Sequence, residues 1–99
     1  MDFAIDRLED VRLAVDETAS MLIKDAEPDS ELECAFIPGD NGQLDLVLSA
    51  YTKTGTLPPT NSFSWTVLTA LVDDVRAVVD SQRLSIHLRA SASENTVSA

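Results

Sequence analysis

Glu17 and Met21 are the first side chains whose types and spacing suggest chemistry. They lie four residues apart in VRLAVDETASMLIKDA, residues 11–26, which has the pattern of an amphipathic helix. Side chains at positions i and i+4 share one helix face, so a carboxylate and a second ligand there could hold a cation between them. The thioether of Met21 is a poor ligand for a hard ion such as Mg²⁺. Glu17 is therefore either a solvated helix carboxylate or part of a reactive site that lacks its second oxygen.

The other reactive residue types do not form a recognisable catalytic set. Cys34, the single cysteine, lies on the apolar face of an alternating segment, which favours a buried thiol over a redox switch. His87 is predicted to face outward without a second His or Cys nearby, so it does not indicate a metal site. Asp73 and Asp74 have the pattern of a solvated helix end. We find no Ser/His/Asp or Cys/His arrangement that would support nucleophilic catalysis.

Glu17, Met21 and Cys34 must be positioned by a helix and a hairpin in the first half of the chain. The helix is predicted from Ile5 to Lys24 by an apolar stripe at three- and four-residue spacing: Ala4, Leu8, Val11, Val15 and Leu22. Pro28 disfavours its continuation. Two alternating segments follow, 31–37 and 43–51, and the turn sequence PGDNG joins them into an antiparallel hairpin. Their predicted inward residues are Leu32, Cys34 and Phe36, then Leu44, Leu46, Leu48 and Ala50.

The second half repeats the helix and the hairpin. After a loop at 52–62, Ser62 or Ser64 is expected to cap a helix with the apolar stripe Val67, Leu68, Leu71, Val72 and Val75. Segments 75–79 and 84–90 form a second hairpin around the turn DSQR. The order α-β-β-α-β-β predicts an α+β fold, a two-layer sandwich with both helices on one face of a mostly antiparallel four-stranded sheet. We assign this domain to residues 1–90 and expect residues 91–99 to be a disordered tail.

Charge narrows the classes of partner. The chain of 99 residues has a formal net charge of −10, and residues 1–40 hold twelve acidic against three basic residues. Such a chain repels phosphates, so direct binding to nucleic acid or to anionic lipid is not expected. No apolar run is long enough to span a membrane and no signal peptide is recognisable, which together with a single cysteine favours a cytoplasmic protein. A basic protein partner would complement the acids, which otherwise only keep the domain in solution.

Two segments carry a resemblance that covers residues 2–90. They are RLEDVRLAVDETASMLI at 7–23 and SFSWTVLTALVDDVRAV at 62–78. Together with the hairpin between them, they resemble anti-sigma factors of the RsbW and SpoIIAB type, which have the GHKL (HATPase) fold, and especially the actinobacterial branch that sequesters a sigma-F-like factor. Members of this family have about one more strand and one long helix at the front. The chain is therefore expected to be an N-terminally shortened form, in which Phe3, Leu13 and Met21 could mark the place of a missing packing element.

The resemblance also implies where a nucleotide would bind. Kinase-active relatives use a helix Glu that activates the attacking group and, four residues later, an Asn that helps hold Mg²⁺; Glu17 matches the first and Met21 replaces the second. In the family's Asp-x-Gly-x-Gly motif, Ala50 stands at the Asp position and Thr52 at the first Gly. The glycine-rich entry to the second helix reads NSFSW, residues 61–65. We therefore expect no cofactor, and no ATP or Mg²⁺ in particular.

The expected function is that of a non-catalytic anti-sigma factor. By resemblance, it binds an alternative sigma factor and is relieved by an anti-anti-sigma protein with a STAS domain. A homodimer is possible because relatives dimerise. The alternative is an ATP-dependent serine/threonine kinase that phosphorylates the anti-anti-sigma protein, with Glu17 as the catalytic residue. Trp65 could anchor a partner, although packing at the edge of the core is the favoured interpretation.

Overall fold

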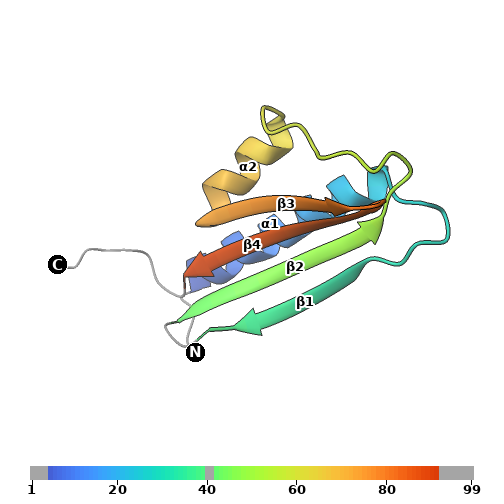
Figure 1. Ribbon diagram of the computed structural model, residues 1–99. Helices are drawn as coiled ribbons and strands as arrows, with labels where there is room; N and C mark the ends of the chain where they lie inside the picture. Colours follow the sequence, from blue (N-terminus) through green and yellow to red (C-terminus); the bar gives the residue numbers. More distant parts are fainter. Residues whose placement is uncertain (1–4, 40–41, 92–99) are drawn as a thin grey trace.

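The computed structural model describes residues 5–39 and 42–91 and contains the predicted elements in the predicted order (Figure 1). They are α1 (Ile5–Lys24), β1 (Glu33–Pro38), β2 (Gln43–Tyr51), α2 (Phe63–Leu71), β3 (Asp74–Asp80) and β4 (Arg83–Ser91). The predictions for Phe3, Ala4 and the tail from residue 92 onward fall outside the described residues. Ser91, which we assigned to the tail, is the last residue of β4.

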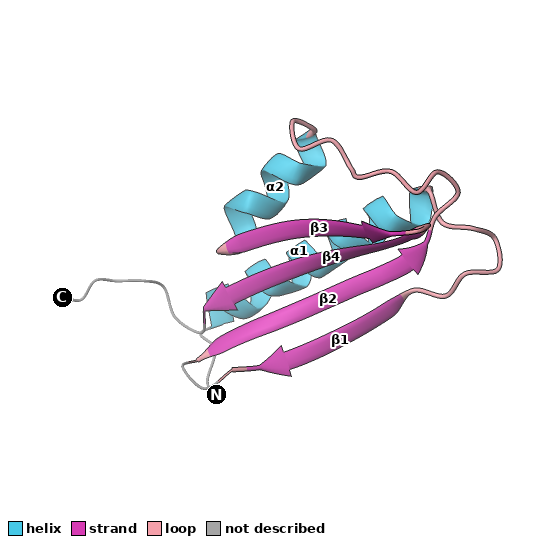
Figure 2. Ribbon diagram, in the orientation of Figure 1, coloured by secondary structure: helices cyan, strands magenta, loops and turns pink. Residues whose placement is uncertain are grey.

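The strands form one antiparallel sheet in the order β1-β2-β4-β3 (Figure 2). Each predicted hairpin is present, and the two hairpins meet where β2 pairs with β4. α1 packs against β2 and β4, while α2 packs against β3 and α1. Both helices therefore cover the same face of the sheet, which confirms the α+β two-layer arrangement. Within the described ranges, neither helix is long and apolar enough to cross a lipid bilayer.

The core lies between the two helices and the central strands. Leu46 opposes Leu88 and Leu48 opposes Ile86 across the β2–β4 pair, and all four side chains are fully buried. α1 buries a stripe that runs through Arg7, Val11, Ala14, Thr18 and Leu22, and α2 buries Leu68. This stripe is rotated from the predicted one, because α1 packs against α2 as well as against the sheet. Leu8, which we placed in the core, is consequently 52% exposed.

β1 departs most from the sequence prediction. It alternates as expected, but no residue of β1 is buried. Cys34 is exposed, and Phe36 is 57% exposed, so the predicted burial of both is wrong. The reason is coverage, since β1 contacts β2 and no helix within the described residues. In Figure 2, β1 is the strand at the edge of the sheet, and the described helices lie over the other strands.

α2 is shorter than predicted. Ser62 is its N-cap, as one of our two alternatives held, and its hydroxyl accepts the Trp65 amide hydrogen at 3.1 Å. The helix ends at Leu71, and the chain turns at Val72 and Asp73 into β3. Val75 is therefore a strand residue packed beside the core rather than part of the helical stripe. Asp73 therefore lies in the turn before β3 and Asp74 is the first residue of β3, so the pair is not a helix end as predicted.

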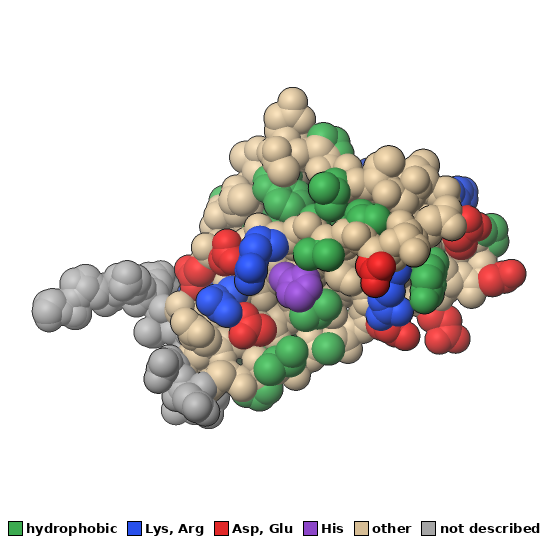
Figure 3. Space-filling view, viewed as in Figure 1, with side chains coloured by type: hydrophobic (Ala, Val, Ile, Leu, Met, Phe, Trp, Pro, Cys, Tyr) green, Lys and Arg blue, Asp and Glu red, His purple; other side chains and the backbone are tan. Residues whose placement is uncertain are grey.

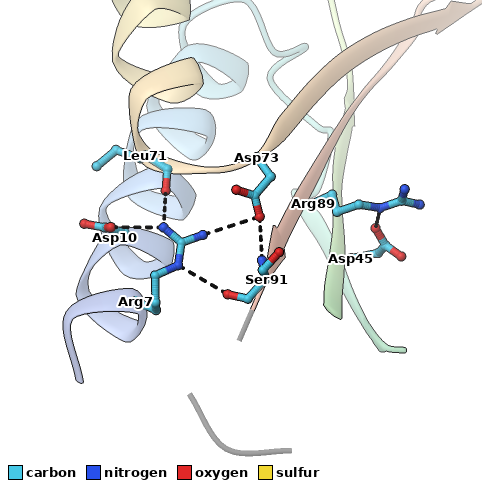
Figure 4. Close-up of polar contacts among 7 residues, drawn as sticks. All are labelled: Arg7, Asp10, Asp45, Leu71, Asp73, Arg89 and Ser91. Carbon is cyan, nitrogen blue, oxygen red and sulfur yellow. Dashed lines mark hydrogen bonds and ion pairs between the residues drawn. The ribbon is translucent and has the colours of Figure 1, made fainter. Parts of the chain in front are cut away.

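Arg7 holds this turn in place (Figure 4). Its guanidinium donates to the carbonyl oxygens of Ser91 at 3.2 Å and Leu71 at 3.4 Å, and it lies 3.3 Å from the Asp10 carboxylate. It also pairs with Asp73 at 3.6 Å, and Asp73 in turn accepts the Ser91 amide hydrogen at 2.7 Å. One buried cation thus joins the start of α1, the end of α2, and the adjacent ends of β3 and β4.

Candidate functional site

Glu17, the predicted catalytic candidate, lies on the flank of α1 that faces α2. It is half-buried, and its Oε2 accepts a hydrogen bond from the hydroxyl of Ser64 at 2.5 Å. Ser64 belongs to the first turn of α2, so this charge-assisted bond ties the two helices together. Glu17 is thus not a freely solvated carboxylate, and one of its oxygens is already engaged with a protein hydroxyl.

A pocket of about 250 Å³ opens beside this bond. One wall is the C-terminal end of α1, with Met21, Lys24 and Asp25. The other walls come from the loop between β2 and α2, the start of α2, and β4, with lining residues Thr56–Pro59, Ser62, Ser64 and Leu84. This is where the sequence resemblance places a nucleotide. Met21 is half-buried and packs against the core, so it fills space here instead of offering a ligand.

The two positions that replace the family's Asp and Gly are both inside the protein. Ala50 is buried in the core. Thr52 is fully buried; its hydroxyl donates to the Gln82 carbonyl oxygen at 3.1 Å and accepts the Gly55 amide hydrogen at 2.9 Å. The side chain that stands where a glycine would leave the backbone open is therefore used to fasten the loop to the β3–β4 turn.

The loop at 52–62 is fastened to α1 as well. The backbone carbonyl of Asp25 accepts the Lys53 amide hydrogen at 2.8 Å, and its carboxylate accepts the Thr54 hydroxyl at 2.6 Å. Gly55 has a φ of +65°, a conformation that other residues adopt with strain, and a side chain there would meet the Ser81 carbonyl oxygen. These bonds fix the first half of the loop, and Pro58 and Pro59 restrict the second half.

The donor set of this pocket does not fit a magnesium-bound triphosphate. Its one lining carboxylate, Asp25, already accepts a hydroxyl, and the residue one turn after Glu17 presents sulfur. Within residues 5–39 and 42–91, no group of three or more His, Cys, Asp or Glu side chains could hold a metal ion. The lining also includes the apolar side chains of Met21, Leu57 and Leu84 and the basic side chain of Lys24.

The opposite face of the sheet is a second candidate surface. Both described helices pack on the other face, and Figure 3 shows charged side chains of both signs on this one. Charged side chains of both signs lie there as ion pairs: Arg89 with Asp45 at 2.9 Å, Arg76 with Asp74 at 3.3 Å, and Arg83 with Glu33. The hydrogen bond that Arg89 donates to Asp45 raises the pKa of Arg89, and the one that Arg83 donates to Glu33 raises the pKa of Arg83. His87 faces this side, as predicted, in a shallow hollow of about 200 Å³. Because its neighbours are already paired, this face offers little net charge to a partner.

Cys34 is exposed, and its thiol pKa is raised. Partial burial of its thiol raises the pKa above the ordinary value, so less thiolate forms at neutral pH. The predicted burial of Cys34 was wrong. The direction of its pKa shift is opposite to the lowered pKa of a redox-active cysteine. Trp65 is half-buried in the first turn of α2, and its role as a partner anchor or as an edge-of-core residue stays a prediction.

Sequence reasoning brought Glu17, Met21 and the 52–62 loop to one place, and the structure agrees. It missed Arg7 and Ser64. Arg7 had a signal, because it precedes Val11 by four residues and thus falls on the buried stripe of α1. Ser64 had none of its own, since its role depends on the packing of two helices that are far apart in the chain.

Comparison with known proteins gives two curated relatives in Mycobacterium tuberculosis. No protein-family model matches the chain. The chain is 39% identical over 82 residues to the anti-sigma-F factor RsbW of strain H37Rv and, with the same values, to that of strain CDC 1551 / Oshkosh. The match covers 83% of this chain and 48% of each relative, so the chain spans about half the length of the relatives it matches. These findings confirm the RsbW-type resemblance.

Proposed function

We propose that this RsbW-like chain acts as an anti-sigma factor that binds an alternative sigma factor of the sigma-F type in the cytoplasm. The similarity to anti-sigma-F factor RsbW over most of the chain is the observation that carries the proposal. The acid-rich N-terminal region supports it, because twelve acidic residues within the first forty complement a basic protein surface and repel nucleic acid.

Binding without phosphoryl transfer is the second part of the proposal, and the pocket supports it. Glu17 is engaged by Ser64, Met21 replaces an oxygen ligand, and buried Thr52 closes the backbone that a nucleotide would approach. Release of the sigma factor would then depend on competition by a STAS-domain anti-anti-sigma protein. A homodimer is compatible with this mode of action and is not required by it.

The direct test is binding to a purified sigma-F-type factor. We expect a complex with a dissociation constant of about 1 μM or tighter, measured by biolayer interferometry at physiological salt, with weaker binding as salt rises. A sigma factor that does not bind at concentrations of about 50 μM would contradict the proposal. A housekeeping sigma factor is the control for specificity.

The kinase alternative is tested separately by thermal unfolding with Mg-ATP. Any ligand that binds the native state raises the melting temperature, by several degrees when its concentration is about 100 times the dissociation constant. We expect no shift at millimolar nucleotide and no radiolabel transfer to a STAS-domain substrate. A clear shift together with transferred label would establish the kinase and overturn the non-catalytic part.

A further inference from the structure

We propose that α2 is a hinged latch, which opens from α1 and β3 as one unit while α1 and the central strands stay folded. We define the latch as α2 itself, Phe63–Leu71. Three observations support it: the short length of α2, its small buried surface and the two polar contacts that hold its ends. The inference goes beyond the proposed function, since it concerns a motion of the chain and holds for any partner.

The sequence of the latch favours a helix only weakly. α2 has nine residues, FSWTVLTAL. Isolated helices shorter than about 12–15 residues are marginal in water. Aromatic and β-branched residues lose side-chain freedom in a helix, and α2 contains five of them: Phe63, Trp65, Thr66, Val67 and Thr69. α2 therefore depends on its contacts with the rest of the protein.

Few apolar contacts hold the latch. All nine residues of α2 are described, and Leu68 is the one that is buried. Leu71 packs beside the core, whereas Phe63 is 82% exposed. Among the described elements, α2 packs against α1 and β3 and contacts neither β2 nor β4. Opening the latch therefore exposes little beyond Leu68 and the surface that it contacts, and the core between α1, β2 and β4 remains.

Two polar contacts hold the ends of the latch against α1. Ser64, in the first turn, donates to the Glu17 carboxylate at 2.5 Å. The carbonyl oxygen of Leu71, in the last turn, accepts from Arg7 at 3.4 Å (Figure 4). Ser64, Leu68 and Leu71 are spaced i, i+4 and i+7, so they share one face of α2. Buried Leu68 thus lies between two hydrogen bonds to α1, one at each end of the latch.

The segments on either side of the latch provide the hinges. Ser62 and Val72, which flank α2, have extended backbone conformations, with ψ of 161° and 170°. Beyond Val72, the Asp73 amide donates to the Arg89 carbonyl oxygen at 2.8 Å, which fixes the start of β3 to β4. Before Ser62, the loop is fastened as far as Gly55. The latch therefore rotates about its flanking residues without breaking a strand pair of the sheet.

Opening the latch changes the pocket. Ser62 and Ser64 line the pocket together with Met21 of α1 and Leu84 of β4. When the first turn of α2 moves away from α1, this wall is lost and the Glu17 carboxylate is released from Ser64. Met21 and Leu84 stay in place, because α1 and β4 remain folded. The latch thus switches the pocket between a closed and an open form.

Native-state hydrogen exchange, followed by NMR, tests the latch. We expect the Leu68 amide to exchange at least about tenfold faster than the Leu88 amide of β4. Leu68 exchange should also respond less to low concentrations of urea, because opening of α2 exposes less surface than global unfolding. Ser64→Ala should accelerate Leu68 exchange about fivefold, since it removes a contact that closes the latch.

Leu46→Val is the matched control. Leu46 is fully buried in β2, outside the described elements that α2 packs against. The substitution should accelerate Leu88 exchange about fivefold and leave Leu68 exchange unchanged, because the core is disrupted in global unfolding and not in the opening of the latch. If α2 opened by global unfolding alone, Leu46→Val would accelerate exchange at both amides equally.

Thiol labelling gives an independent measurement. In a Cys34→Ser background, Leu68→Cys and Leu88→Cys each place the single thiol of the chain at a fully buried site. We expect labelling at least about tenfold faster in Leu68→Cys than in Leu88→Cys. The proposal is overturned if the two thiols are labelled at equal rates, or if Leu68 and Leu88 amides exchange equally fast with the same urea dependence. It is also overturned if Ser64→Ala leaves Leu68 exchange unchanged, or if Leu46→Val accelerates it as much as Leu88 exchange.

Discussion

β1 and β4 have the same alternating pattern and opposite environments. In β4 the residues Leu84, Ile86, Leu88 and Ala90 are all buried. In β1 the corresponding face carries Cys34 and Phe36, and the whole strand is exposed. β4 is the neighbour of two strands and lies under α1, whereas β1 is an edge strand beyond the reach of either helix.

The difference shows what alternation means physically. A period of two residues determines which side chains share a face of a strand. Burial also requires a second layer above that face, and the position of a helix depends on its own packing partners. Two hydrogen bonds join α1 to α2: Arg7 donates to the Leu71 carbonyl oxygen, and Ser64 donates to the Glu17 carboxylate. One end of the sheet is thereby closed and the other left open.

The largest expected effect compares the two strands directly. Ile86→Ala should lower the free energy of unfolding by about 3 kcal/mol, because it leaves a cavity in a fully buried site. Phe36→Ala should lower it by less than about 1 kcal/mol, since its ring is mostly in water. Urea denaturation measures both. Equal losses would mean that something covers β1 in solution and would break the comparison.

Substitution of Arg7 is expected to cause the second-largest loss of stability. Arg7→Met keeps the length of the side chain but removes the cation that holds Leu71, Asp73 and Ser91, so we expect a loss of about 2–3 kcal/mol. Arg12→Met is the control, because its pairs with Glu9 and Asp16 are exposed, and it should change stability by less than about 0.5 kcal/mol. Similar losses of stability for both variants would show that the packing of α1 against the ends of α2, β3 and β4 does not depend on Arg7.

The bond between the helices should have a smaller effect. Glu17→Ala and Ser64→Ala each remove the charge-assisted hydrogen bond, and a double-mutant cycle should give a coupling energy of about 1 kcal/mol. Additive losses, with no coupling, would show that Glu17 does not hold α2 against α1. The carboxylate would then be free for the chemistry that the kinase alternative assigns to it.

Cys34 should have the smallest effect on stability and a distinctive reactivity. Cys34→Ser should change stability by less than about 0.5 kcal/mol, because the site is exposed. The raised pKa predicts slower alkylation by iodoacetamide at pH 7.5 than in the urea-unfolded chain, since less thiolate is present in the folded protein. The difference should narrow as the pH rises above both pKa values. A folded thiol that never reacts would instead mean that β1 is covered.

Much of the fold was predictable because it depends on short-range signals. The apolar period of α1, the alternation of the first two strands, and the Ser62 cap are all local signals, and the structure contains the helix, the paired strands and the cap. The errors occurred where distant elements decide the outcome. Val75 lies in β3 and not in α2, because the chain turns at Val72 and Asp73. Leu8 lies outside the core, because α1 packs against α2 as well as against the sheet.

The candidate site divides in the same way. The identities of Met21, Ala50 and Thr52 already argue against a nucleotide, because a thioether, a methyl group and a bulky side chain stand where oxygens and open backbone are needed. The partner of Glu17 was not foreseeable, since Ser64 is 47 residues away in the chain. The hydrogen bonds of Thr52 to the β3–β4 turn and to Gly55 likewise arise from the packed loop.

The amino-acid order alone specified the helices, the hairpins, the acidic N-terminal region and the residue types that argue against a nucleotide, because each depends on residue type and near-neighbour spacing. The tertiary structure decided which apolar residues are covered, which carboxylate is engaged and which strand stays exposed. These depend on the distance between α1 and its neighbours, and a helix that packs closely against one side of a sheet leaves the other side exposed.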